Sequence, residues 1–198
     1  MPNSHRLSIL TLCLVLGACF EPEEPDAQSM QQPSLLAAAE QGDLPGINRL
    51  ITQTTEVDIR DACLWTPLMK AALNGHREAA RRLLEAGADV NLTDKGGYSA
   101  LMLAASNNHA DLVELLLSAG ADLNQVEQTG GFTALIWASQ LGHTASVKRL
   151  LDAHADTTMK DFDGMSASDR ARANGHQDIL ALITTSEKAV SEKPVSAR

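Results

Sequence analysis

Four histidines recur in one register along the chain and could do chemistry together. They are His76, His109, His143 and His176, separated by 33, 34 and 33 residues. Histidine is the commonest metal ligand and titrates near neutral pH, so a column of imidazoles could bind a metal ion or relay protons. In a stack of helical units, however, neighbouring rings would lie about 8–10 Å apart, whereas Zn–N bonds are about 2 Å long. We therefore predict a structural column and no metal site.

An acidic column shows the same regularity. Asp89, Asp122 and Asp156 end successive units, and Asn91 and Asn124 follow two of them. Paired carboxylates can act as general acid and base, but recurrence in every unit favours a structural role. The sequence contains no Gly-rich phosphate loop, nucleophile elbow or Cys-x-x-Cys motif. We predict a protein without enzymatic activity or cofactor.

The three cysteines are too few for a disulfide scaffold. Cys19 follows Leu16-Gly17-Ala18 and ends the apolar stretch 7–18, which is too short to span a bilayer but has the length of a signal-peptide core. This segment resembles the lipobox of bacterial lipoproteins, which implies a signal peptide over residues 1–18 and acylation of Cys19. An ordinary secretory signal with a chance cysteine is the alternative. Cys63 then remains as a thiol, either a chance small residue or a disulfide partner.

Residues 19–33 are rich in acidic residues and proline, a composition that favours an extended tether. Phe20, rather than Asp, follows Cys19, and by resemblance to enterobacterial sorting this favours the outer membrane over inner-membrane retention. We expect a lipid-anchored protein of the bacterial cell envelope, facing the periplasm. Its membrane contact would be the acyl anchor at Cys19.

Composition narrows the class of partner. The chain carries 16 basic and 25 acidic residues, for a formal net charge of −9. Phosphate surfaces need clustered Lys and Arg, so we expect no nucleic-acid partner. Hydrophobic residues make up 44%, which suits a globular domain, and aromatics make up only 3%, which is unlike an aromatic-rich β-sandwich.

The body of the chain repeats with a period of 33 or 34 residues. The shared features are a Thr or Ser start before Leu, paired leucines, and a Gly-Ala-Asp or His-Ala-Asp end. Five units result, over about 34–60, 61–93, 94–126, 127–160 and 161–183. Each unit alone would expose apolar surface, which its neighbours cover.

This pattern resembles the ankyrin repeat, in its length, Thr-Pro-Leu start, Gly-His turn and Gly-Ala-Asp-Val-Asn end. The resemblance implies an all-α solenoid of helix-turn-helix units with β-hairpin-like finger loops, and a histidine that caps backbone groups before each second helix. Local chemistry agrees. Thr66-Pro67 suits a helix start, and Gly75 and Gly142 suit left-handed helix ends.

Some positions depart from the family pattern. Met69, Met102, Ile136 and Asp169 replace its histidine after Leu, so we expect apolar packing there. Leu64 stands at a turn position that is glycine in later units, which predicts a turn of another shape. Unit five is polar, as a terminal cap requires. Residues 184–198 are predicted to be disordered.

The few aromatic residues indicate a binding surface. Trp65, Tyr98 and Phe132 share one repeat position, with Met165 fourth, and Phe162 lies in the same finger as Met165. The resemblance places this position at the edge of the concave surface, where ankyrin arrays bind partners. An exposed row of rings suits a binding hot spot; packing between fingers is the alternative. Residues near the ends of the first helices would floor the surface: Leu73, Asn74, Ser106, Asn107, Gln140, Leu141 and Asn174. Trp137 belongs either to this floor or to the packing.

We therefore expect a membrane-anchored periplasmic module, monomeric and non-catalytic, that binds a protein partner on its concave surface. Two alternatives remain open at this point. An inhibitor or immunity protein would use the same surface to block an exported toxic enzyme. A structural envelope spacer would pack on itself or on the cell wall.

Overall fold

The computed structural model describes residues 34–54 and 56–191. The predicted signal peptide, Cys19 and the tether lie outside the described residues. The chain divides into two units at Gln32–Pro33, and all the described helices belong to the second. Within the described ranges, no helix is both long enough and apolar enough to cross a membrane.

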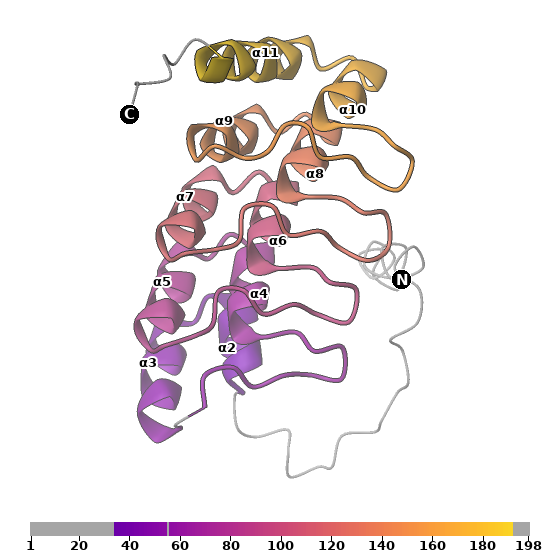
Figure 1. The fold of residues 1–198 in the computed structure, drawn as a ribbon. Coiled ribbons are helices and arrows are strands. Elements are labelled where there is room, and N and C mark those ends of the chain that lie inside the picture. The colour runs from indigo at the N-terminus through magenta and orange to yellow at the C-terminus, as the bar shows by residue number, and fades with distance from the viewer. Residues whose placement is uncertain (1–33, 55, 192–198) are drawn as a thin grey trace, which may run out of the picture. The chain divides into compact units, whose positions relative to one another are not determined.

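The helices stack in two layers (Figure 1). The inner layer consists of α2 (Leu35–Gln41), α4 (Pro67–Leu73), α6 (Ala100–Ser106), α8 (Ala134–Gln140) and α10 (Ala167–Ala173). The outer layer consists of α3 (Leu44–Gln53), α5 (Arg77–Glu85), α7 (Ala110–Ser118), α9 (Thr144–Asp152) and α11 (Gln177–Ser191). Each helix packs on the next helix of its own layer and on its partner within the unit. The predicted all-α solenoid is confirmed.

Each of the four later inner helices begins at a hydroxyl side chain. The side chain of the N-cap residue accepts a hydrogen bond from the backbone N–H three residues on, which satisfies an amide that the helix leaves free. The caps are Thr66, Ser99, Thr133 and Ser166. In unit five the cap is reciprocal, because the Asp169 carboxylate accepts from the backbone N–H of Ser166 at 3.1 Å.

The core lies between the two layers and is built of small and aliphatic side chains. Alanines such as Ala72, Ala105 and Ala138 are fully buried and let the inner helices approach closely. Met69, Met102 and Ile136 are each 1% exposed. Apolar packing therefore does replace the histidine of the family pattern in units two to four, as expected. In unit five Asp169 serves the helix cap instead.

Two expectations about local structure are wrong. The turn at Leu64 was expected to differ in shape from the later ones. Leu64 has φ 65°, and Gly97, Gly131 and Gly164 have φ of 84°, 76° and 76°, so all four finger turns have a left-handed residue at the same position. Leu64 adopts this conformation at a steric cost of about 1–2 kcal/mol. The predicted disorder from residue 184 is also wrong as far as Ser191, because α11 continues to that residue. Its stretch Glu187-Lys188-Ala189 is made of good helix formers.

Candidate functional site

The histidine column links each unit to the one before it. The Nε2 atoms of His76, His109, His143 and His176 lie 3.0, 3.2, 2.9 and 3.1 Å from backbone oxygens near the ends of the preceding inner helices. These acceptors are the carbonyls of Glu40, Leu73, Ser106 and Gln140. The histidines therefore cap backbone groups, as predicted, and the groups are carbonyls of the preceding unit; the side chains of the first three make no hydrogen bond to their own outer helices. The column is a ladder between units.

The Asp and Asn column forms a second ladder. The side chains of Asp58, Asn91 and Asn124 accept hydrogen bonds from the backbone N–H groups of Asp89, Asp122 and Asp156 in the next unit, at 3.0, 2.7 and 3.0 Å. The carboxylate of Asp89 in turn accepts from the N–H of Asn91, two residues on. The carboxylates of Asp89, Asp122 and Asp156 thus hold the turns after the outer helices. The links between neighbouring units are made by the side chains of the preceding unit.

A third column, which is acidic and which sequence reasoning missed, holds the fingers. Oδ1 of Asp61, Asp94 and Asp161 accepts from the backbone N–H groups two and four residues later, at 2.8–3.0 Å. The residues four places on are Trp65, Tyr98 and Met165, which belong to the predicted aromatic row. The signal was present in the sequence, as an acidic residue four places before Trp65, Tyr98 and Met165 and five places before Phe132 in the longer unit four.

Unit four has one extra residue and a longer acid to match it. Glu127 replaces Asp, and its Oε1 accepts from the N–H groups of Gly130 and Phe132 at 2.7 and 3.0 Å. Its Oε2 accepts from the N–H of Thr129 at 2.6 Å and from the hydroxyl of the same residue. The extra residue therefore lies in this finger, and both oxygens of the buried carboxylate are satisfied.

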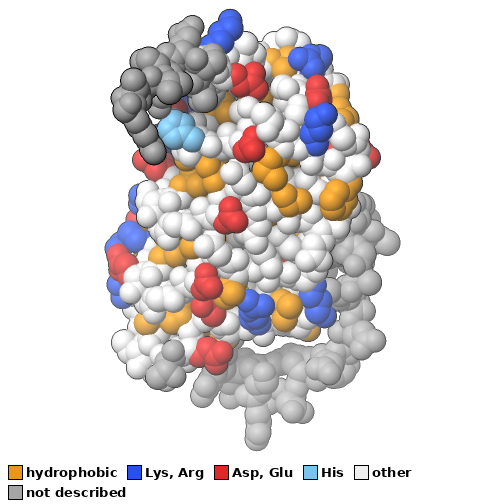
Figure 2. Space-filling view, viewed as in Figure 1, with side chains coloured by type: hydrophobic (Ala, Val, Ile, Leu, Met, Phe, Trp, Pro, Cys, Tyr) orange, Lys and Arg blue, Asp and Glu red, His pale blue; other side chains and the backbone are white. Residues whose placement is uncertain are grey.

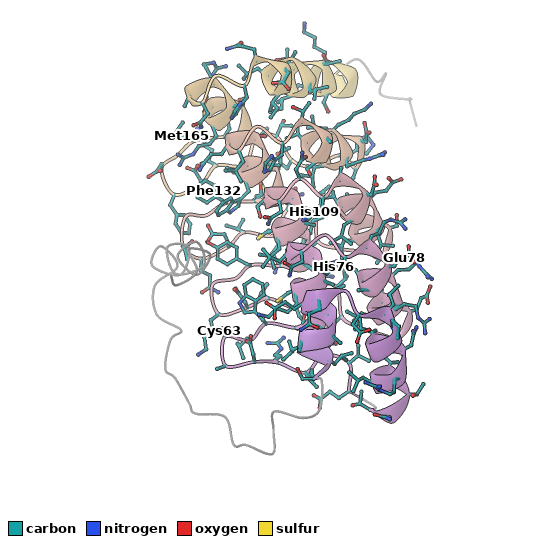
Figure 3. The ribbon with its side chains drawn as sticks, turned by 180° about the vertical axis from the view of Figure 1, so that it is seen from behind. Cys63, His76, Glu78, His109, Phe132 and Met165 are labelled. Atoms are coloured by element: carbon teal, nitrogen blue, oxygen red, sulfur yellow. The ribbon has the colours of Figure 1, made fainter. Side chains whose placement is uncertain are left out.

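Consecutive fingers are also joined by backbone hydrogen bonds. The N–H groups of Lys95, Gln128 and Phe162 donate to the carbonyls of Cys63, Gly96 and Gly130, one finger earlier, at 3.1, 2.8 and 2.9 Å. Figure 3 shows Cys63, Phe132 and Met165 on this side of the array, with Glu78 on the outer helix layer. We call this side, formed by the fingers and the inner helices, the finger side.

The aromatic row is less exposed than expected. Trp65, Tyr98 and Phe132 are half-buried and pack against the core. The Tyr98 hydroxyl lies 2.8 Å from Thr129 Oγ1 in the next finger. The prediction of an exposed row is therefore wrong for these three rings, because neighbouring fingers and inner helices cover them. Phe162 differs: it is 69% exposed, the highest exposure among the large hydrophobic side chains of residues 34–54 and 56–191.

Trp137 of α8 joins two of these rings into one cluster. Its ring centroid lies 6.2 Å from that of Tyr98, edge to face, and 5.2 Å from that of Phe132. Trp137 therefore lies on the finger side, between two fingers. Its buried indole Nε1 has no hydrogen-bond partner among the described residues. The sequence left its location open.

The predicted floor residues divide into two kinds. Asn74, Asn107 and Asn174 are exposed, and their side-chain Nδ2 atoms each donate to a carbonyl of their own inner helix at 2.9 Å. Leu141 occupies the same position in unit four without that group and is 42% exposed. The remaining three, Leu73, Ser106 and Gln140, are half-buried. Leu141 is thus the apolar exception in a column of helix-capping amides.

The two outer fingers have a cation beside their acid. Lys70 Nζ lies 3.8 Å from Asp61 Oδ2 and 5.0 Å from the centroid of Trp65. Arg170, at the same repeat position, lies 2.6 Å from Asp161 Oδ2 through Nε, with its Cζ 5.2 Å from the centroid of Phe132. Leu103 and Trp137 occupy this position in units three and four. Within the described parts of the chain, no Lys or Arg forms an ion pair with Asp94 or Glu127.

The pKa values follow these surroundings. Burial raises the pKa of Asp94, and its backbone hydrogen bonds only partly counter this. Burial also acts to raise the pKa values of Glu127 and Asp161, but their hydrogen bonds outweigh it and both pKa values are lowered. The N–H groups and hydroxyl around Glu127 bring its pKa below the usual value. Arg170 does the same for Asp161.

The described residues contain no group of three His, Cys, Asp or Glu side chains placed to hold a metal ion. Cys63 is half-buried in the first finger and forms no disulfide within the described part of the chain. Hydrophobic side chains form several separate patches between charged ones on the face shown in Figure 2.

The fold and the finger side together define a helical repeat solenoid of the kind that presents a surface to partners. Comparison with protein families gives the same result. Residues 35–127 match the family model described as ankyrin repeats in three copies, and residues 130–162 match that of a single ankyrin repeat. Together these matches cover more than half of the chain, so the protein belongs to the ankyrin-repeat family. No curated protein matches the sequence at a significant level.

Ankyrin repeats indicate a protein–protein interaction module. Proteins of this family are generally binding modules without catalytic activity. The family matches end at residue 162, so the match does not include the polar fifth unit. That unit is nevertheless built like the others, with a capped inner helix, a finger acid and a histidine link to unit four.

Proposed function

We propose that the protein is a lipid-anchored, non-catalytic binding module of the bacterial cell envelope that holds a protein partner on its finger side. The observation that carries the binding surface is the concentration of exceptions to the repeat pattern there. Trp137 and Leu141 replace a cation and an amide, and Phe162 is left largely exposed. Side chains that serve the repeat recur in every unit, whereas these do not.

The anchoring part of the proposal rests on the sequence alone. The lipobox-like Leu16-Gly17-Ala18-Cys19 supports acylation of Cys19, and Phe20 supports transfer to the outer membrane. Two or more acyl chains would hold the protein stably at a membrane, whereas a single chain would not. The acidic, proline-containing segment 20–33 would separate the array from the lipid surface.

Site-specific photocrosslinking tests the binding surface in intact cells. A photoreactive phenylalanine analogue would be placed at Phe162 or Leu141, and at Ala145 as the control. Ala145 is exposed on outer helix α9, away from the fingers. We expect one protein to crosslink from 162 and 141 but not from 145. Crosslinking from position 145 alone would contradict the proposal. If the crosslinked protein is an enzyme and the array inhibits it, the inhibitor alternative is favoured.

Membrane fractionation tests the anchor separately. Cys19→Ser would remove the acylated thiol, and we expect the variant protein to leave the outer-membrane fraction. Cys63→Ser is the matched control, because it removes a thiol from the finger of unit two and leaves the lipobox intact. Unchanged outer-membrane fractionation of Cys19→Ser would contradict lipid anchoring, whatever the crosslinking shows.

A further inference from the structure

The four finger acids share one repeat position but not one environment. Asp61 and Asp161 use Oδ1 to hold their finger and Oδ2 to face a cation of their own chain. Glu127 is buried, and all its contacts come from its own finger. Asp94 uses Oδ1 in the common way, for the N–H groups of Gly96 and Tyr98. Within residues 34–54 and 56–191, no Lys or Arg forms an ion pair with this carboxylate, although the backbone N–H of Gly97 also acts on it.

The missing cation is explained by one substitution. Leu103 stands in unit three where Lys70 stands in unit two and Arg170 in unit five. The repeat register places this position beside the finger acid, as the two ion pairs show. Unit three therefore has an apolar side chain at the position of the cation, and Asp94 is half-buried, which raises its pKa. A half-buried carboxylate in this state gains most from a cation that approaches from outside.

Aromatic rings adjoin this carboxylate. The Tyr98 ring packs over Gly96, where a Cβ would come within 2.8 Å of it, and Trp137 meets Tyr98 edge to face. In the outer units the cation both faces its acid and lies 5.0–5.2 Å from an aromatic centroid. Unit three thus has the acid and the rings of this arrangement without the cation. Cations are attracted to ring faces as well as to carboxylates.

We propose that Asp94 and the Tyr98–Trp137 pair receive a Lys or Arg side chain of the protein partner. The incoming cation would complete in unit three the contact that Lys70 and Arg170 make within the chain. This inference rests on the proposed binding function and names the chemistry of its partner, a basic segment. The net charge of −9 favours the same kind of partner, because it steers basic surfaces toward the array.

A display selection supplies the probe for a test. The full chain, purified in detergent, would be used to select binders from a random library of 12-residue peptides. An enriched peptide would be compared with its analogue in which norleucine replaces lysine, or citrulline replaces arginine. We expect Lys or Arg to be enriched, and the neutral analogue to bind about tenfold more weakly, which is the usual scale for loss of a partly buried charge pair.

Two variants assign this preference to Asp94. Asp94→Asn keeps Oδ1 as an acceptor for the finger amides while removing the charge, and it should abolish the preference for the charged peptide. Leu103→Lys should weaken the charged peptide by about tenfold, because it places a cation of the chain beside Asp94, as Lys70 is placed beside Asp61. Asp152→Asn is the matched control: it removes one charge at an exposed position on α9 and should retain the preference.

The indole N–H signal of Trp137 in NMR spectra separates the possible failures. Peptides that shift this signal but contain no enriched Lys or Arg would overturn the inference and leave the proposed function standing. A charge preference that survives in Asp94→Asn would do the same. Enriched peptides that shift only signals of the outer helices would overturn the proposed function, and the inference with it.

Discussion

The helix layers and the finger side follow different rules. In the helix layers, units two to four repeat the same contacts, with a hydroxyl cap, a histidine link to the preceding unit and a buried leucine, namely Leu83, Leu116 and Leu150. On the finger side, the units share the acid that holds the turn, the left-handed turn and the backbone links between fingers. The side chain beside the acid changes from Lys70 to Leu103, Trp137 and Arg170. Contacts that recur maintain the stack, and those that vary are free to define a binding surface.

The largest expected effect comes from the repeated core. Leu116 of α7 is fully buried between the layers. Leu116→Ala should lower the free energy of unfolding by about 3 kcal/mol, through lost burial and a residual cavity. Denaturant unfolding monitored by circular dichroism measures this. Leu117→Ala, at a half-buried site on the same helix, should cost clearly less; equal losses would contradict the assigned packing.

The histidine ladder should give a smaller and more uniform effect. His109→Ala and His143→Ala each remove the donor to a carbonyl of the preceding unit. Each should lower the free energy of unfolding by about 1–2 kcal/mol, because a partly buried carbonyl loses its partner. Similar losses at both positions would sharpen the contrast with the fingers. Losses that differ several-fold would show that the histidine hydrogen bonds contribute unequally to stability although their geometry is regular.

Leu64 is an exception within a repeated turn, and correcting it should stabilise the protein. Leu64→Gly removes the steric strain of φ 65°, although glycine gains entropy in the unfolded chain. We expect a net gain of about 0.5–1 kcal/mol in the free energy of unfolding. Ala62→Gly in the same finger is the control and should not stabilise, since Ala62 does not have positive φ. A lower free energy of unfolding in Leu64→Gly would mean that packing of the Leu64 side chain stabilises the protein by more than the strain costs.

The finger acids of units three and four should respond oppositely to pH. The raised pKa of Asp94 means that its charged form opposes folding, so Asp94→Asn should stabilise at pH 7, and the gain should vanish as the pH falls below the usual value of aspartate. The lowered pKa of Glu127 means that its charge supports folding above the usual value of glutamate. Glu127→Gln should therefore destabilise at pH 7, and the loss should shrink as the pH falls through the lowered pKa.

Thermal unfolding of both variants between pH 3 and pH 8 checks this pair of predictions. Because Asn and Gln keep an oxygen that can accept from the finger amides, the comparison isolates the charge. Shifts of the same sign in both variants at pH 7 would contradict the assignment of different environments to the two acids.

The sequence predicted the helix layers well because their constraints are local and repeated. Thr66-Pro67, the left-handed Gly75 and Gly142, and the leucine spacing each specify backbone or packing on their own. The turn at Leu64 was predicted wrongly, because hydrogen bonds from the finger to Asp61 impose a conformation that leucine would otherwise avoid.

The finger side was predicted less well, because its contacts join different units. The burial of Tyr98 depends on Thr129 and Trp137, which are more than thirty residues away. Whether a ring on a finger is exposed is decided by the next finger and by one inner-helix side chain. The acidic column that holds the fingers could have been found from its spacing of four or five residues to the aromatic row.

The central claim is that partners bind on the finger side. The indole N–H signal of Trp137 in NMR spectra of the full chain tests this claim most directly. Trp137 lies between two fingers. Its Nε1–H signal should therefore shift when the partner that the crosslinking identifies is purified and added to the unmodified protein. A second expectation is that amide signals of α5, α7 and α9 stay in place. An unchanged Trp137 signal, with shifts confined to those outer helices, would contradict the claim.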